Sequence, residues 1–79
     1  MPIKTVMLID DDSVNNFVNK RLLLRQDDSL KIEAFESGDA SLERLQDQNL
    51  RAPDLILLDL NMPEMSGWQF LESYIELGL

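Results

Sequence analysis

Cysteine, long apolar runs and internal repeats are all absent from this chain of 79 residues. Without cysteine, neither a disulfide nor a thiolate metal site can hold the fold together, a composition compatible with a reducing cytoplasm. The longest uninterrupted apolar runs are about four residues, against the ~20 needed to span a bilayer. The amino terminus has no signal-peptide pattern. We therefore expect a soluble, cytoplasmic protein.

Basic residues are scarce, with 7 Lys and Arg against 15 Asp and Glu and a net charge of -8. This balance argues against direct binding of nucleic acid or of an anionic membrane. The length allows one small domain over residues 1–79. A chain this short buries roughly 60% of its unfolded surface, so we expect marginal stability.

Two short apolar runs, at residues 6–9 and 55–58, each end in aspartate. Asp10 and Asp11 follow the first run, and Asp59 follows the second. Such runs are typical of buried parallel strands, whose carboxyl ends share one edge of a sheet. Carboxylates that converge there repel one another unless a cation neutralises them, and oxygen ligands suit Mg²⁺. The sequence therefore predicts a magnesium site at this edge.

The chain is predicted to alternate strands with helices. The strands are expected at residues 5–9, 31–35 and 55–58, and a cap at Asp12 or Ser13 opens the first helix. The second helix is expected from Ser37 to about Asp47, with Leu42 and Leu45 inward. A β-α-β-α-β-α order implies right-handed crossovers and a parallel sheet.

Apolar residues recur at helical spacing in the first and third helices. In the first helix they are Val14, Phe17, Val18, Leu22 and Leu24. The third helix, after the loop at 61–67, has one stripe of Trp68, Leu71 and Ile75, with Phe70 and Tyr74 beside it.

With these residues in hand, the chain closely resembles the receiver domain of two-component response regulators. The first marker is Leu8-Ile9-Asp10-Asp11-Asp12-Ser13. The second and more specific marker is Asp59-Leu60-Asn61-Met62-Pro63-Glu64-Met65-Ser66-Gly67, about 48 residues beyond the aspartate pair. The resemblance implies a flavodoxin-like three-layer α/β fold with strand order 2-1-3. It covers only the first three βα units of a five-unit family.

The resemblance also implies a role for each acidic residue. Asp59 resembles the phospho-acceptor, Asp11 the direct Mg²⁺ ligand, and Asp10 the residue that contacts Mg²⁺ mainly through water. The backbone carbonyl of Asn61 resembles a further metal ligand, aimed by a turn that Pro63 shapes. The implied donor is a phosphohistidine on a sensor histidine kinase or a phosphotransfer protein. The implied domain signals through its aspartyl phosphate, and its only reactions are its own phosphorylation and dephosphorylation.

The family's switch Ser or Thr and its Lys would lie beyond Leu79. We therefore expect impaired phosphorylation and an exposed third strand, which favours a homodimer or a strand-exchanged oligomer. Two alternatives remain at this point. One is a self-associating half-domain without a signalling role. The other is a haloacid-dehalogenase-type phosphatase, which expects a second aspartate where this chain has Asn61.

Overall fold

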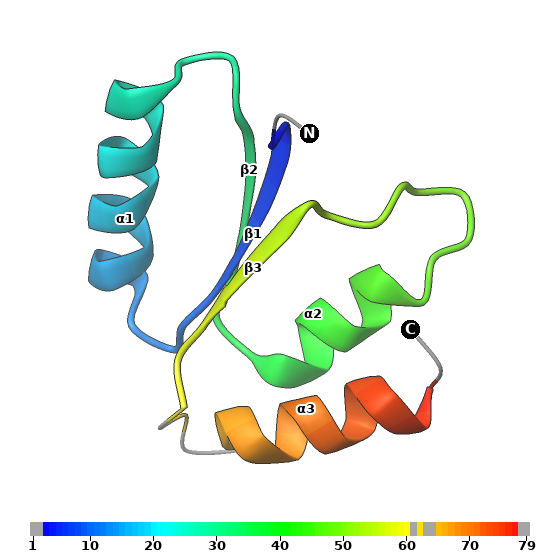
Figure 1. Cartoon of the computed structure of the whole chain (residues 1–79). Helices are drawn as coiled ribbons and strands as arrows, with labels where there is room; N and C mark the ends of the chain where they lie inside the picture. Colours follow the sequence, from blue (N-terminus) through cyan, green and yellow to red (C-terminus); the bar gives the residue numbers. More distant parts are fainter. Residues whose placement is uncertain (1–2, 61, 63–64, 78–79) are drawn as a thin grey trace.

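The sheet has three parallel strands in the order β2-β1-β3. A computed structural model describes residues 3–60, 62 and 65–77. The strands are β1 (Thr5–Ile9), β2 (Lys31–Phe35) and β3 (Leu55–Leu58), at the predicted positions. Figure 1 shows β1 between its two neighbours. The predicted strand order and flavodoxin-like class are confirmed.

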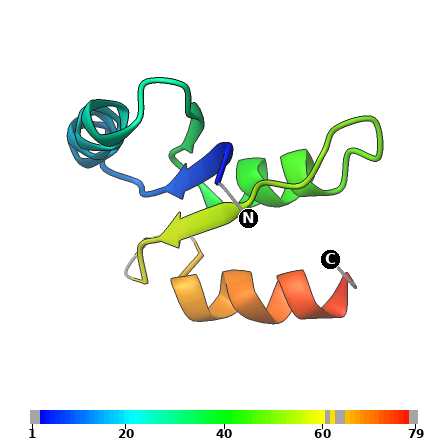
Figure 2. The ribbon, with the colours of Figure 1, turned by 45° about the horizontal axis from the view of Figure 1, so that its top comes forward.

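Three helices cover the two faces of the sheet and make three layers. They are α1 (Ser13–Gln26), α2 (Gly38–Leu45) and α3 (Gly67–Glu76). Helix α1 lies on one side of the sheet, and α2 and α3 lie together on the other (Figures 1 and 2). Across the described part of the chain, no helix combines the length and apolarity needed to cross a membrane.

Each helix begins at a polar side chain that caps its free amide groups. The Asp12 carboxylate accepts from the backbone N–H groups of Val14 and Asn15, which confirms it as the predicted cap. The Ser37 hydroxyl accepts from the N–H of Ala40 at the start of α2. Helix α3 begins with a capping box, in which Ser66 and Gln69 each accept a hydrogen bond from the backbone N–H of the other. These caps fix where the chain turns from a strand edge into a helix.

The core lies between the sheet and the pair α2 and α3. Met7 and Ile9 of β1 project to this side and pack with Leu42, Met62 and Phe70. Phe70 is 1% exposed, and its ring lies 6.2 Å from the ring of Tyr74. The inward position predicted for Leu42 is confirmed, and Leu45 packs against the same cluster.

The apolar stripes predicted on α1 and α3 are present, but most of their residues are exposed, and of the five on α1 only Leu24 is partly buried. On α1, Val14, Phe17, Val18 and Leu22 are exposed, and Phe17 is 61% exposed. On α3, the residues beside the predicted stripe are the ones that pack inward, while Trp68, Leu71 and Ile75 are exposed. On the α1 side of β3, Leu57 is 40% exposed. Helical spacing identifies a stripe, but the neighbours of the helix decide whether that stripe is covered.

Two polar ties hold the outer elements to the sheet. The Arg44 guanidinium binds Glu33 in a two-pronged ion pair, with Nε–Oε1 at 2.6 Å and Nη2–Oε2 at 3.1 Å. The Asp54 carboxylate accepts from the backbone N–H groups of Lys4 and Thr5, both at 2.9 Å. The first tie joins α2 to β2, and the second joins the start of β3 to the start of β1.

Candidate metal centre

The three predicted acidic residues meet at the carboxyl edge of the sheet. Asp10, Asp11 and Asp59 each offer a carboxylate oxygen, and these oxygens all lie within 4.8 Å of one another. The backbone explains the convergence, because hydrogen bonding continues one residue past the strands. The N–H of Asp59 donates to the carbonyl of Ile9 at 2.9 Å, and the N–H of Asp10 donates to the carbonyl of Phe35 at 3.0 Å.

The electrostatics of the cluster appear in the pKa of Asp11, which is raised above its ordinary value. Partial loss of hydration is the largest cause, although the side chain remains exposed. The charges of Asp59 and Asp10 and a side-chain hydrogen bond with Asp59 raise the pKa further, against a lowering by the backbone amide of Asp11. The ionised form of Asp11 is therefore disfavoured in the folded protein, and a bound cation would stabilise it.

The donor set fits Mg²⁺. The carboxylate oxygens all lie within 4.8 Å of one another, which is close enough for one small ion to gather them. All three donors are hard carboxylate oxygens, and partial exposure leaves room for the waters that Mg²⁺ retains. The fourth predicted ligand, the carbonyl of Asn61, lies outside the described residues, as does Pro63.

The loop that follows Asp59 returns closely to its own start. The N–H of Gly67 donates to the carbonyl of Leu60 at 3.1 Å. A Cβ at position 67 would lie 2.6 Å from Leu60 Cα and 2.9 Å from the Asp59 carbonyl oxygen. Only glycine permits this approach, so Gly67 allows α3 to begin directly against the backbone that presents Asp59.

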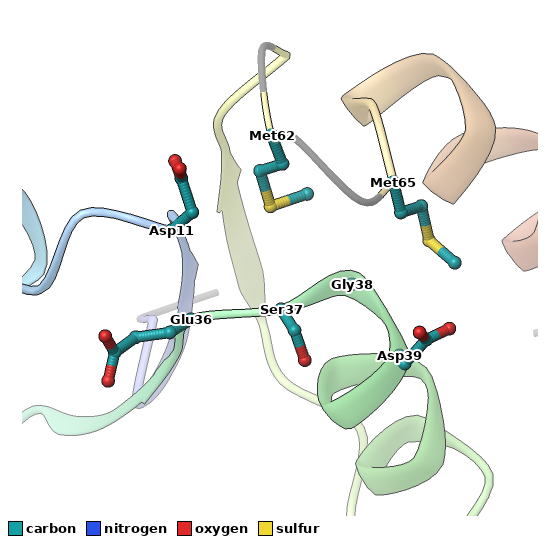
Figure 3. Close-up of a pocket in the computed structure, with 7 residues that line it drawn as sticks. All are labelled: Asp11, Glu36, Ser37, Gly38, Asp39, Met62 and Met65. Atoms are coloured by element: carbon teal, nitrogen blue, oxygen red, sulfur yellow. The ribbon is translucent and has the colours of Figure 1, made fainter.

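A cavity of about 300 Å³ opens beside the cluster on the side of α2. Figure 3 shows Asp11 at one end of it and Met65 at the other, with Met62 between them in this view and the start of α2 below. A second recess, of about 230 Å³, is lined by Asp10 and Asp59 and opens on the side of α1. The acidic cluster is therefore reached from both faces of the sheet.

One polar residue near the cluster had no role in the sequence interpretation. Asn16 is buried, and its side chain reaches the ends of β1 and β2. Asn15 and Asn19 belong to the same helix and are exposed. No signal in the sequence separates the three asparagines, because the rotation of α1 decides which one meets the strand ends.

Comparisons with known proteins agree with this arrangement. Residues 6–76 match the family model described as the response regulator receiver domain. A crystal structure of a two-component response regulator from Cytophaga hutchinsonii superposes with a TM-score of 0.87 at 31% identity, covering 96% of this chain and 59% of that one.

Two curated relatives show the same family in different contexts. The nitrate/nitrite response regulator protein NarL of Escherichia coli K12 is 35% identical over 75 residues, which are 95% of this chain and 33% of that protein. A protein-glutamate methylesterase/protein-glutamine glutaminase of Cereibacter sphaeroides is 41% identical over 73 residues, which are 92% of this chain and 20% of that protein. The chain thus spans a third or less of the length of these relatives. It belongs to the response regulator receiver domain family of two-component systems.

Proposed function

We propose that Asp59 accepts a phosphoryl group from a phosphohistidine on a sensor histidine kinase or a phosphotransfer protein, in a reaction that depends on Mg²⁺. The observation that carries this proposal is the convergence of Asp10, Asp11 and Asp59 within 4.8 Å. Membership of the receiver family supports the same function.

The chemistry assigns a distinct task to each part of the site. A carboxylate oxygen of Asp59 attacks phosphorus, the P–N bond to the donor imidazole breaks, and the leaving ring nitrogen keeps the electron pair and takes up a proton. Because nucleophile and phosphoryl group are both anionic, the site acts mainly by positioning and neutralisation. A bound Mg²⁺ would supply that neutralisation, and Asp10, Asp11, Asp59 and the carbonyl of Asn61 would hold it. Because the carboxylate already carries one negative charge, the aspartyl phosphate adds about one more at neutral pH, together with new acceptor oxygens, and this change is the signal.

A mass measurement tests the proposal. The protein is incubated with acetyl phosphate and Mg²⁺, and its intact mass is recorded with and without a chelator. We expect the gain of one phosphoryl group, lost with the chelator and in Asp59→Ala, and retained in Asp28→Ala, which changes an exposed aspartate in another loop. No gain on the unchanged protein, or an undiminished gain in Asp59→Ala, would rule out this role.

We propose further that residues 1–79 correspond to the amino-terminal part of a receiver domain. The support is the coverage, since 96% of this chain matches only 59% of the Cytophaga hutchinsonii regulator chain.

Self-association through β3 is the second candidate function. Within the described residues, β3 pairs with β1 alone, and Leu57 on its α1 side is 40% exposed. An apolar edge strand offers unpaired backbone groups to a second chain, which fits a homodimer or an exchange of strands. Sedimentation velocity tests it, with Leu57→Lys expected to shift any dimer towards monomer. A compact monomer at micromolar concentration and high salt, where the net charge of -8 is screened, would contradict it.

A further inference from the structure

Asn16 is the residue that α1 buries against the sheet. Within α1, all of whose residues are described, it is the one buried side chain, at 5% exposure. Polar side chains in such a position require hydrogen-bond partners. The Nδ2 group of Asn16 donates to the carbonyl of Asp10 at 3.0 Å and to the carbonyl of Phe35 at 3.2 Å. One amide therefore bridges the carboxyl ends of β1 and β2.

The orientation of this amide is fixed by its partners. Both partners are carbonyl oxygens, so the nitrogen must face the strands and the oxygen must face away. Among the described residues, the buried Oδ1 atom of Asn16 has no hydrogen-bond partner. A buried acceptor without a partner lowers folding stability. Leucine has nearly the same size and would avoid this cost, but it would give up the hydrogen bonds to Asp10 and Phe35. Because the two effects oppose each other, stability alone does not require an amide here.

The contacts of the amide lead directly to the acidic cluster. The carbonyl of Asp10 is held by Asn16, while Oδ1 of Asp10 accepts from the N–H of Asp12 at 2.9 Å. The carbonyl of Asp12 in turn accepts from the N–H of Asn16 at 3.1 Å. Asn16 of α1 thus hydrogen-bonds to both ends of the turn that presents Asp10 and Asp11, at the carbonyl of Asp10 and at the carbonyl of Asp12.

We propose that Asn16 is a positioning residue for the metal centre: by holding the carbonyl of Asp10 from α1, it aims Asp10 and Asp11 at Asp59. The inference rests on the proposed Mg²⁺ binding and adds to it a residue that does not itself touch the ion. Residues that orient metal ligands in this way commonly change metal affinity by about 10- to 100-fold when replaced.

The test separates affinity for Mg²⁺ from folding stability. Asn16→Leu removes both the donor to the strand carbonyls and the unpartnered acceptor, whose effects on stability oppose each other, so we expect unfolding in urea at nearly the same denaturant concentration as the unchanged protein. Titration calorimetry with MgCl₂ should give a Kd raised by about tenfold or more. Asn49→Leu makes the same chemical change in an exposed loop and should leave both readouts unchanged.

Two further variants complete the design. Asn16→Asp keeps the shape but loses the donor, and we expect it to weaken Mg²⁺ binding as well. If Asn16→Leu does not fold, Asn16→Gln and Asn16→Met form a second pair of equal length, of which only the glutamine can donate. The glutamine variant should then bind Mg²⁺ more tightly than the methionine variant.

The outcomes distinguish this inference from the function on which it rests. If the unchanged protein binds no Mg²⁺, the proposed function fails. If it binds Mg²⁺ and Asn16→Leu, or the methionine variant in its place, binds equally well, Asn16 has a structural role only and the inference is overturned.

Discussion

Replacing Gly67 with alanine would place one methyl group where α3 begins against the backbone of the metal centre. The new Cβ would lie 2.6 Å from Leu60 Cα, whereas ordinary contact begins at 3.4 Å. The difference, 3.4 minus 2.6, means that the backbone next to Asp59 must retreat by about 0.8 Å. It must also relieve a 2.9 Å approach to the Asp59 carbonyl oxygen.

The expected cost follows from this overlap. Forcing an extra carbon into packed structure costs about 1–3 kcal/mol, and Gly67 meets backbone, which yields less easily than a flexible side chain. We therefore expect a loss of about 2 kcal/mol in the free energy of unfolding, or about 8–16 °C in Tm for a domain of this size. Because Mg²⁺ requires near-ideal ligand geometry, displacement of Asp59 should weaken its binding.

Gly38→Ala is the matched control. A Cβ there would lie 2.5 Å from the Met65 sulfur, near the end of a flexible side chain that can move away. We expect a loss of less than about 1 kcal/mol, and unchanged Mg²⁺ affinity. Urea unfolding and titration calorimetry measure both quantities. Equal stability and equal Mg²⁺ affinity in Gly67→Ala and the unchanged protein would refute the reasoning, as would an equal loss of affinity in Gly38→Ala.

Three other changes probe charges. Arg44→Met leaves the largely buried Glu33 with only the longer contact to Lys31, at 3.9 Å, and should cost about 2 kcal/mol in urea unfolding. The double variant with Glu33→Met should recover most of that loss, and no recovery would contradict the pairing. Asp11→Asn should stabilise the metal-free protein at pH 7. The folded-state pKa of Asp11 is raised, so the free energy of unfolding of the unchanged protein falls as the pH rises from 3.8 through that pKa. Equal stability of the two proteins in the presence of a chelator would contradict this expectation. Asp54→Asn should destabilise at neutral pH, because backbone N–H donors lower the Asp54 pKa. That stability is present above 3.8 and lost as the pH falls through the lowered pKa, so the two unfolding curves should converge in acid.

The strands were predictable because their signal is local. A short run of apolar or alternating residues bounded by polar residues favours a strand, and this signal needs no knowledge of distant neighbours. The bounds of β1, β2 and β3 agree with the prediction for this reason, although only the central strand β1 is buried on both faces and Leu57 of β3 is 40% exposed. The acidic cluster followed from the same signal, since carboxyl ends of parallel strands share an edge and each of two runs ends in aspartate.

The helices were predictable in position but not in rotation. Spacing placed apolar residues on one side of α1, yet Phe17 is exposed on that side and Asn16 is buried on another. The same happened in α3, where Phe70 is buried and Trp68 is exposed. A helix presents its sides to whatever neighbours the fold supplies, and no window of local sequence contains those neighbours.

By itself, the sequence determined the order of strands and helices, the parallel sheet and the acids that gather at its edge, because each depends on a short run of residues. Only the tertiary structure decided which asparagine holds Asp10, how closely Gly67 returns to Leu60, and that Arg44 pairs with Glu33. These contacts join residues distant in the chain or depend on how a helix is turned. Their geometry exists only once the layers have packed.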